Sequence, residues 1–195
     1  MPAAADVTIR IASLADVQAL AGAHVASWRE TYAGMMPDEL LASLSVDARA
    51  AMWTKVLDEP LTPASTVVYV AELENRIAGF GSCGAQRTEA LKQRFYDGEI
   101  IAIYVLKAFQ RHAIGRKLLS ALASHLSQSG FAAASLWVLR DNTPARQFYE
   151  RYGAQVIAER EDVRKDAVLS EVAYGWTRLP ELARITAPQA GNTRR

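Results

Sequence analysis

Residues 99–116 combine apolar, small and basic side chains in an order that suits the binding of a phosphate group. An apolar strand is expected first, and a turn then opens an amphipathic helix. The first N–H groups of a helix have no partner within it, and together with the helix dipole they attract anions. Ala113 and Gly115 are small enough to let a ligand approach that backbone closely. Arg111 and Arg116 supply positive charge beside it. The pattern predicts a pyrophosphate site, and the alternative is an ordinary strand–helix turn whose arginines are merely solvated.

Two commoner phosphate motifs do not fit the sequence. Gly115-Arg-Lys-Leu118 lacks the Ser or Thr that follows the lysine of a P-loop. The first expected strand, at residues 7–11, is followed by Ala-Ser-Leu-Ala and not by the glycine cluster of a dinucleotide-binding fold. A phosphate site here therefore belongs to a different architecture.

A second group of residues capable of chemistry lies on the first expected helix. His24, Trp28 and Tyr32 recur at i, i+4 and i+8, so they share one face of that helix. The plainer interpretation puts Trp28 in the core and leaves His24 half-buried. Cys83 is expected to be a small buried hydrophobe, because no histidine lies near it in the sequence to activate a thiol.

The elements that must position these residues follow from hydrophobic periodicity, caps and turn residues. Strands and helices alternate along most of the chain, without repeats or an internal linker, so one mixed α/β domain is expected. Strands are expected at residues 7–11, 66–71, 76–84, 99–106, 134–139, 155–163 and 169–177, and helices at 13–32, 37–44, 47–57, 116–129 and 142–152. Residues 85–98 are expected to form a loop or a strand extension.

Composition limits the class of protein. A chain of 195 residues predicts one domain, and its 22 Lys and Arg against 21 Asp and Glu leave a net charge of +1. Such a balance argues against nucleic acid as a partner and against a polybasic membrane anchor. The single cysteine and three scattered histidines cannot build a metal cluster, so no metal is expected. Without a visible signal peptide or membrane span, a cytoplasmic location is expected.

Two sequence blocks resemble the GCN5-related N-acetyltransferases, also called GNAT proteins. Gln110-Arg-His-Ala-Ile-Gly115 is similar to that family's acyl-CoA pyrophosphate motif, Gln/Arg-x-x-Gly-x-Gly/Ala. The second block, at 136–153, has a strand, Asn142, a Phe-Tyr-Glu triplet and a closing glycine at the family's spacing. Ala113 stands where the family usually has its first glycine, so weaker or slightly displaced phosphate contacts are expected.

The resemblance covers residues 7–178 and implies the α/β fold of that family. This fold has a central, mixed, mostly antiparallel sheet of about seven strands flanked by helices. Residues 1–180 are expected to form the N-acetyltransferase domain, and residues 181–195 a flexible C-terminal tail. The segment from Ser27 to Gly34, Ser-Trp-Arg-Glu-Thr-Tyr-Ala-Gly, also resembles an N-terminal signature of a bacterial subgroup.

The resemblance further implies acetyl-CoA as the cosubstrate and assigns residues to it. Its pantetheine arm would pair with the central strand like an added strand, and strand N–H groups would polarise the thioester carbonyl. Asn142 would touch the cosubstrate, although it could equally serve as the N-cap of the next helix. The residues implied in binding are Ile103, Tyr104, Val105, Gln110, Arg111, His112, Ala113, Ile114, Gly115, Arg116, Asn142 and Tyr149.

Two residues are implied in catalysis. Tyr149 would protonate the departing thiolate, although packing on its short helix would equally explain an aromatic residue there. Glu99 would remove the proton from the acceptor amine, directly or through water, unless it is only a charge at the end of a strand. Some relatives carry a Glu five residues before the Asn, but Trp137 occupies that place here.

The acceptor is implied to be a small-molecule or peptide amine, and Trp28 and Tyr32 are the candidate residues that bind it. The expected function is therefore acetyl transfer to a primary amine by direct attack in a ternary complex. An acyltransferase with another acyl-CoA or acceptor, and a CoA-binding sensor without turnover, are the alternatives. The sequence does not define an oligomeric state, and a homodimer is the expectation from the frequency of that symmetry.

Overall fold

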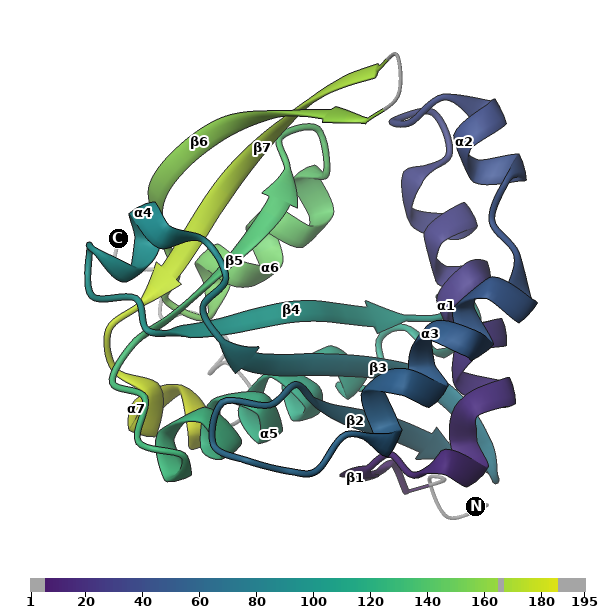
Figure 1. Ribbon diagram of the computed structural model, residues 1–195, viewed down its shortest axis with the longest axis horizontal. Helices are drawn as coiled ribbons and strands as arrows, with labels where there is room; N and C mark the ends of the chain where they lie inside the picture. The colour runs from purple at the N-terminus through teal and green to yellow at the C-terminus, as the bar shows by residue number, and fades with distance from the viewer. Residues whose placement is uncertain (1–5, 165–166, 186–195) are drawn as a thin grey trace, which may run out of the picture.

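A twisted seven-stranded sheet organises the computed structural model, which describes residues 6–164 and 167–185 (Figure 1). The strand order is β1-β2-β3-β4-β5-β7-β6. All neighbouring strands are antiparallel except β4 and β5, which are parallel. The strands are β1 (Thr8–Ile11), β2 (Val67–Leu73), β3 (Arg76–Ala85), β4 (Gly98–Val105), β5 (Ala134–Leu139), β6 (Gln155–Arg164) and β7 (Ala167–Trp176).

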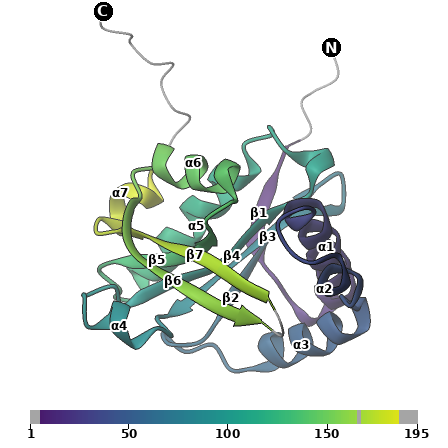
Figure 2. The same cartoon turned by 90° about the horizontal axis from the view of Figure 1, so that it is seen from above.

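Helices cover the two faces of this sheet unequally. In Figures 1 and 2, α1 and α3 lie over the first half of the sheet, and α5, α6 and α7 lie on the opposite side. The helices are α1 (Val17–Tyr32), α2 (Asp38–Ala42), α3 (Val46–Asp58), α4 (Glu89–Lys92), α5 (Ile114–Gln128), α6 (Thr143–Arg151) and α7 (Leu179–Ala183), with single 3₁₀ turns η1 (Leu14–Asp16) and η2 (Lys107–Phe109). The expected mixed, mostly antiparallel α/β architecture is confirmed.

The core consists of one layer on each side of the sheet. On one side, Leu20 of α1 and Trp53 of α3 pack against Phe80 of β3. On the other side, the leucines of α5 recur at three- and four-residue intervals, and Leu122 and Leu126 are fully buried against β3, β4 and β5. The apolar periodicity of α5 therefore fixes which face of the helix meets the sheet.

Two short helices lie where the sequence indicated none. Part of the expected loop at 85–98 forms α4, which buries Leu91. The expected tail begins too early, because α7 extends to Ala183 and inserts Leu179 and Leu182 into the main core. Neither segment is long enough to show a hydrophobic period, so periodicity gave no signal for α4 or α7. The rest of that tail, 186–195, lies outside the described residues.

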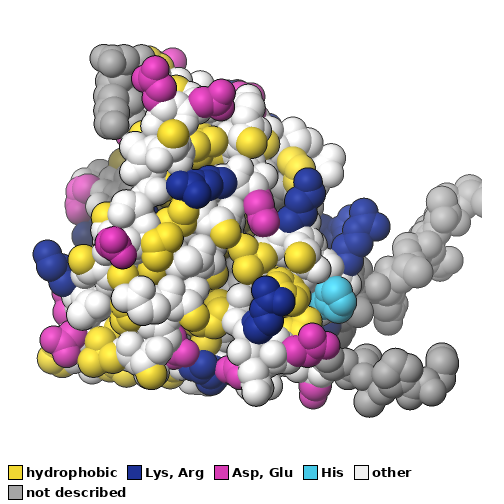
Figure 3. All heavy atoms as spheres, turned by 90° about the vertical axis from the view of Figure 1, so that its right-hand side faces the viewer, with side chains coloured by type: hydrophobic (Ala, Val, Ile, Leu, Met, Phe, Trp, Pro, Cys, Tyr) yellow, Lys and Arg dark blue, Asp and Glu magenta, His cyan; other side chains and the backbone are white. Residues whose placement is uncertain are grey.

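The surface shows no dominant charge on the flank that α1, α2 and α3 form. Basic and acidic side chains are scattered there among hydrophobic ones (Figure 3). Within the described ranges, no helix has the length and apolar character needed to cross a membrane.

Candidate active site

The parallel strands β4 and β5 separate soon after they begin. They pair only at Gly98 with Ala134 and at Glu99 with Ser135, although β4 continues to Val105. The other edge of β4 remains paired with β3 along its whole length. Among the described residues, no strand pairs with the β5-facing edge of β4 over residues 101–105, so this edge can accept an extended ligand as an added strand. This is the arrangement expected around Ile103 and Tyr104.

The turn after β4 brings unpaired amides of α5 to the same end of the sheet. Ala113 is the N-cap of α5, and the first backbone bond into the helix runs from Lys117 N to the Ala113 carbonyl. The preceding amides of the first helical turn are thus free to bind an anion. Gln110, Arg111 and His112 lie exposed around them.

Left-handed backbone explains why glycine suits this turn. Ala113 has a φ of 58° and Arg111 a φ of 67°. Gly115 serves a different purpose, because a Cβ there would lie 3.3 Å from Cε2 of Phe148. Its lack of a side chain lets α5 and α6 approach closely, and Ile114 beside it is buried under the turn.

The two arginines of the motif have different surroundings. Arg116 donates from Nη1 to the Ile185 carbonyl at 3.2 Å, so it also ties α5 to the end of the described chain. Arg111 projects into solvent beside the free amides. Asn142 is buried and caps α6, since its Oδ1 accepts from Ala145 N at 3.2 Å. A contact of Asn142 with a cosubstrate would have to use its amide NH₂ group.

Three tyrosines from three elements meet beside the separated strands. Tyr32 of α1 and Tyr104 of β4 share a hydrogen bond of 2.8 Å between their hydroxyls. Tyr149 of α6 is buried, with its ring 6.0 Å from that of Trp176. Burial raises the pKa of Tyr149, and the nearby Tyr32 raises it further. Burial and Tyr32 likewise raise the pKa of Tyr104, with a contribution from Tyr149.

Aromatic rings of α1 line the approach to these hydroxyls. The rings of Trp28 and Tyr32 meet edge to face at 5.3 Å, and the Arg49 guanidinium lies 5.1 Å from the Trp28 ring centre. His24 is buried behind them, 5.2 Å from the ring of Phe80, and burial lowers its pKa to about 4. Trp28 and Tyr32 are both half-buried. They therefore form a wall beside β4 as well as part of the packing.

Glu99 is held by an ion pair that the sequence did not indicate. Its Oε2 accepts from Arg87 N at 3.0 Å and from Arg87 Nε at 2.9 Å, and its Oε1 accepts from Arg87 Nη2 at 2.8 Å. The carboxylate is buried. Direct proton transfer from an amine to Glu99 would require this pair to open.

Cys83 has none of the properties of a nucleophile. It is fully buried among residues of α5 and the sheet, and burial raises the pKa of its thiol to about 12. Since the thiolate is the reactive form, a covalent acyl-cysteine step through Cys83 is excluded.

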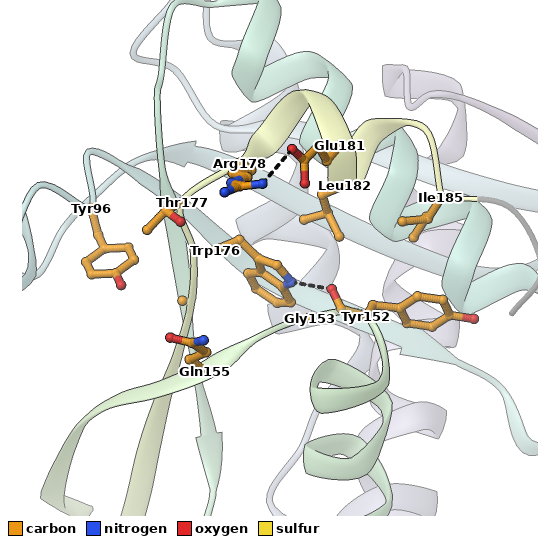
Figure 4. A pocket seen from close by; sticks show the side chains of 11 residues that line it. Tyr96, Tyr152, Gly153, Gln155, Trp176, Thr177, Arg178, Glu181, Leu182 and Ile185 are labelled. Carbon is orange, nitrogen blue, oxygen red and sulfur yellow. Dashed lines mark hydrogen bonds and ion pairs between the residues drawn. The ribbon is translucent and has the colours of Figure 1, made fainter. Parts of the chain in front are cut away.

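Two surface pockets, each of about 490 Å³, lie away from this site. One is enclosed by β7, α7 and the end of α6, where Trp176 Nε1 donates to the Tyr152 carbonyl at 2.8 Å (Figure 4). The other lies between α1 and the β2–β3 hairpin. Neither is lined by a residue assigned to cosubstrate binding or catalysis, so the separated strands remain the candidate site.

The geometry places most of the expected site residues at one end of β4. The sequence did not reveal the Tyr32–Tyr104 contact, because the two residues are 72 positions apart and nothing local signals their meeting. The pairing of Arg87 with Glu99 was missed for a related reason, since it depends on the turn at α4 bringing the chain back to β4.

Comparison with known proteins decides the family. The model of the Acetyltransferase (GNAT) family matches residues 27–154 of the 195. The chain belongs to this acetyltransferase family. It is 37% identical over 177 residues to the uncharacterized N-acetyltransferase YuaI of Bacillus subtilis (strain 168), covering 90% of this chain and 96% of that one. The protein is thus an N-acetyltransferase, and its acceptor is an amine.

Solved structures agree with this GNAT assignment at the level of the fold. The PaiA N-acetyltransferase of Thermoplasma acidophilum, in complex with coenzyme A, has a TM-score of 0.68 at 20% identity and covers 85% of this chain and 98% of its own. YncA of Salmonella typhimurium, with its cofactor acetyl-CoA, has a TM-score of 0.66 at 23% identity and covers 95% and 99%.

Proposed function

We propose that this GNAT protein transfers the acetyl group of acetyl-CoA to a primary amine by direct attack in a ternary complex. The observation that carries the proposal is the unpaired edge of β4 at residues 101–105, next to the free amides of α5. The pantetheine arm of acetyl-CoA is an extended chain with amide groups and needs a strand edge, and its pyrophosphate needs free amides. The segment from Ser27 to Gly34, which contains Trp28 and Tyr32, would place the protein in the bacterial subgroup whose signature it resembles.

Binding would use main-chain groups more than side chains. The pantetheine arm would bond along Ile103, Tyr104 and Val105, and the pyrophosphate would bind the amides at Ala113–Arg116 with Arg111 beside them. The N–H groups of β4 near the thioester would polarise its carbonyl, as preorganised donors do in an oxyanion hole. Gln110 and His112 would border the phosphate.

Tyr149 would act as the general acid. A free thiol has a pKa of about 8.5 and a free phenol one of about 10, so the phenol is protonated whenever a thiolate forms. Burial raises the pKa of Tyr149 and keeps the hydroxyl protonated at neutral pH. Burial penalises the thiolate as well as the phenolate, so the proton would pass to sulfur while the carbon–sulfur bond breaks.

Glu99 would accept the proton of the acceptor amine through a water molecule. The carboxylate is anchored by Arg87 at the start of the unpaired edge, so a bridging water could pass the amine proton to it. In the transfer, the amine nitrogen bonds to the acetyl carbonyl carbon, the carbon–sulfur bond breaks, and the thiolate takes the proton of Tyr149. One ammonium proton leaves to solvent by way of Glu99 before the attack. The nitrogen loses a second proton to water after the carbon–nitrogen bond forms, and Tyr149 regains one proton from water, so the net release is one proton.

Calorimetric titration with CoA and release of free thiol from acetyl-CoA test the proposal together. We expect one CoA site per chain and thiol release that requires a primary amine. The engaged state of Glu99 favours one alternative, a CoA-binding module without turnover. CoA binding without amine-dependent release from a broad panel of amines would support that module and overturn the proposed reaction.

A further inference from the structure

Two arginine–carboxylate pairs lie on one face of the sheet next to the site. The register places Glu99 beside Ser135 on neighbouring strands, Trp137 two residues further along β5, and Glu171 opposite Leu139 on β7. Side chains at alternate positions share a face, so all five side chains belong to one face of the sheet. We call this surface, with the two arginines Arg87 and Arg160 that cover it, the arginine face.

The charges of the arginine face are layered. The carboxylate side chains of Glu99 and Glu171 are only 6% and 8% exposed, whereas those of Arg87 and Arg160 are 64% and 39% exposed. A guanidinium group has donors and no acceptors. The buried acids are therefore capped by cations, and a ligand that reaches this surface meets hydrogen-bond donors.

Arg160 is held rigidly with one edge in use. Its Nε donates to Glu171 Oε2 at 2.7 Å, and its Nη2 lies 2.6 Å from the same oxygen, which leaves Nη1 and the outer hydrogen of Nη2 for a ligand. Its guanidinium lies 4.0 Å from the ring centre of Trp137. Because β7 lies between β6 and β5, this side chain crosses a whole strand to reach Trp137. Stacking on an indole and an ion pair together fix the guanidinium plane, which suits bidentate recognition by its other edge.

Arg87 is connected to the same group. Trp137 Nε1 donates to Thr88 Oγ1 at 3.2 Å, and Thr88 follows Arg87 in the chain. Arg87 uses Nε and Nη2 on Glu99, which leaves Nη1 at its exposed end. Arg160 thus stacks on the indole, Arg87 precedes the residue that accepts from the indole N–H, and each guanidinium has donors to spare.

The arginine face adjoins the aromatic wall of α1. Leu139, two residues beyond Trp137 on the same face, packs in one cluster with Met36 of the α1–α2 turn, and Trp28 and Tyr32 pack against that cluster. Tyr32 in turn bonds to Tyr104 beside the unpaired edge of β4. An acceptor bound between the aromatic wall and Trp137 would therefore have the unpaired edge of β4 on one side and the arginines on the other.

We propose that the acceptor of the proposed acetyl transfer is an amine that also carries a carboxylate, as a free amino acid does. The free edge of Arg160 would bind that carboxylate, with Arg87 next to it, while the amine lies against Trp28 and Tyr32. The inference rests on the proposed function, because it names the substrate class of that same reaction. A polyamine carries positive charge and would need acidic groups in place of the arginines. The acidic residue nearest to Arg160 along β6 on this face is Asp162.

Matched acceptors provide the first test. Thiol release from acetyl-CoA is measured with the common amino acids, with their α-carboxamides, with spermidine and with phosphoethanolamine. We expect at least one amino acid to have a kcat/KM about 100-fold above that of its own carboxamide, which has the same size without the charge. A preference for phosphoethanolamine would indicate that the arginines bind a phosphate, and it would overturn the proposal that they bind a carboxylate.

Variants of Arg160 locate the effect. Arg160→Gln should raise KM for the preferred amino acid by 10- to 100-fold and leave kcat/KM for its carboxamide unchanged, and Arg160→Lys should keep the ion pair but restore little of the binding. Arg140 is the matched control, since it pairs with Glu159 at 2.6 Å on the neighbouring position of β6. Arg140→Gln should leave kcat/KM unchanged for both the amino acid and its carboxamide. Melting curves of all three variants verify that they fold.

The outcomes separate this inference from the reaction it rests on. Turnover of amines with no preference for a carboxylate, or a preference for spermidine, would overturn the inference and leave acetyl transfer intact. Equal losses for the amino acid and its carboxamide in Arg160→Gln would make Arg160 structural and also overturn it. If no member of the panel stimulates thiol release, the proposed reaction fails first.

Discussion

The hydroxyl of Tyr149 is a proton donor in an apolar, buried setting close to the unpaired edge of β4. Its ring is fixed by Trp176 and by Phe148, whose ring centre lies 5.4 Å away. A phenol held in this way stays protonated at neutral pH, because burial raises its pKa. Removing only the hydroxyl oxygen should therefore affect chemistry and leave binding alone.

Tyr149→Phe should lower kcat by about 100-fold, the usual size of general acid catalysis, with an unchanged Kd for CoA. Steady-state thiol release and calorimetry measure the two quantities. Tyr152→Phe is the matched control on the same chain segment, because Tyr152 borders the pocket of Figure 4 and not β4. Turnover by Tyr149→Phe at the wild-type rate would remove Tyr149 from the mechanism.

His24 should make the protein sensitive to acid. Its pKa in the folded state is about 4, below the ordinary value of 6.5, because burial disfavours the imidazolium. Between these values the unfolded chain binds the proton and the folded chain does not, so stability falls as the pH drops from about 6.5 to 4. The loss should reach about 2 kcal/mol at pH 5 relative to pH 7.5.

Urea unfolding at pH 7.5 and pH 5 checks this expectation. His24→Phe, which keeps a ring among Trp28, Trp53 and Phe80, should lose about 2 kcal/mol less stability than the wild type over that interval. His112→Gln alters an exposed histidine and serves as the control. An identical pH dependence in His24→Phe and the wild type would contradict the role of His24.

At the scale of elements, the turn between β4 and α5 is the proposed pyrophosphate site, and its backbone is strained at Arg111 and Ala113. Left-handed backbone costs a residue with a Cβ about 1 kcal/mol or more, and a glycine almost nothing. Ala113 has this conformation at the N-cap of α5. A glycine at this position would therefore relieve the backbone as well as allow a phosphate to approach.

Ala113→Gly should relieve that strain. The glycine also adds freedom to the unfolded chain, so the net gain in the free energy of unfolding should be about 0.5 kcal/mol. The affinity for CoA should rise as well, because the amides can approach the pyrophosphate more closely. Ala108→Gly, in η2 at a residue without a positive φ, should instead destabilise the protein. Weaker CoA binding by Ala113→Gly would contradict this view of the turn.

At the scale of the whole molecule, local patterns predicted nearly all of the sheet and the longer helices. The apolar run of β4, the small residues of the following turn and the leucine spacing of α5 are contiguous in the sequence, so they could be recognised there. The burial of Leu179 in the core could not, because it depends on where α7 meets α5 and the sheet.

The candidate site divides in the same way. Main-chain groups of β4 and α5 were expected from one segment, whereas the ion pair of Glu99 and the stacking of Arg160 on Trp137 join residues brought together only by the sheet order. The proposed acceptor side is therefore the part that required the structure, and the proposed cosubstrate side is the part that the sequence indicated.

Hydrogen exchange of the intact protein with and without CoA, read by mass spectrometry of its peptides, tests the location of the cosubstrate most directly. The unpaired edge of β4 and the free amides of α5 should become protected together, in peptides that cover residues 101–105 and 112–116. Peptides around Tyr152 and Trp176, at the pocket of Figure 4, should exchange as before. Protection at that pocket, with none at β4 and α5, would contradict the proposed site.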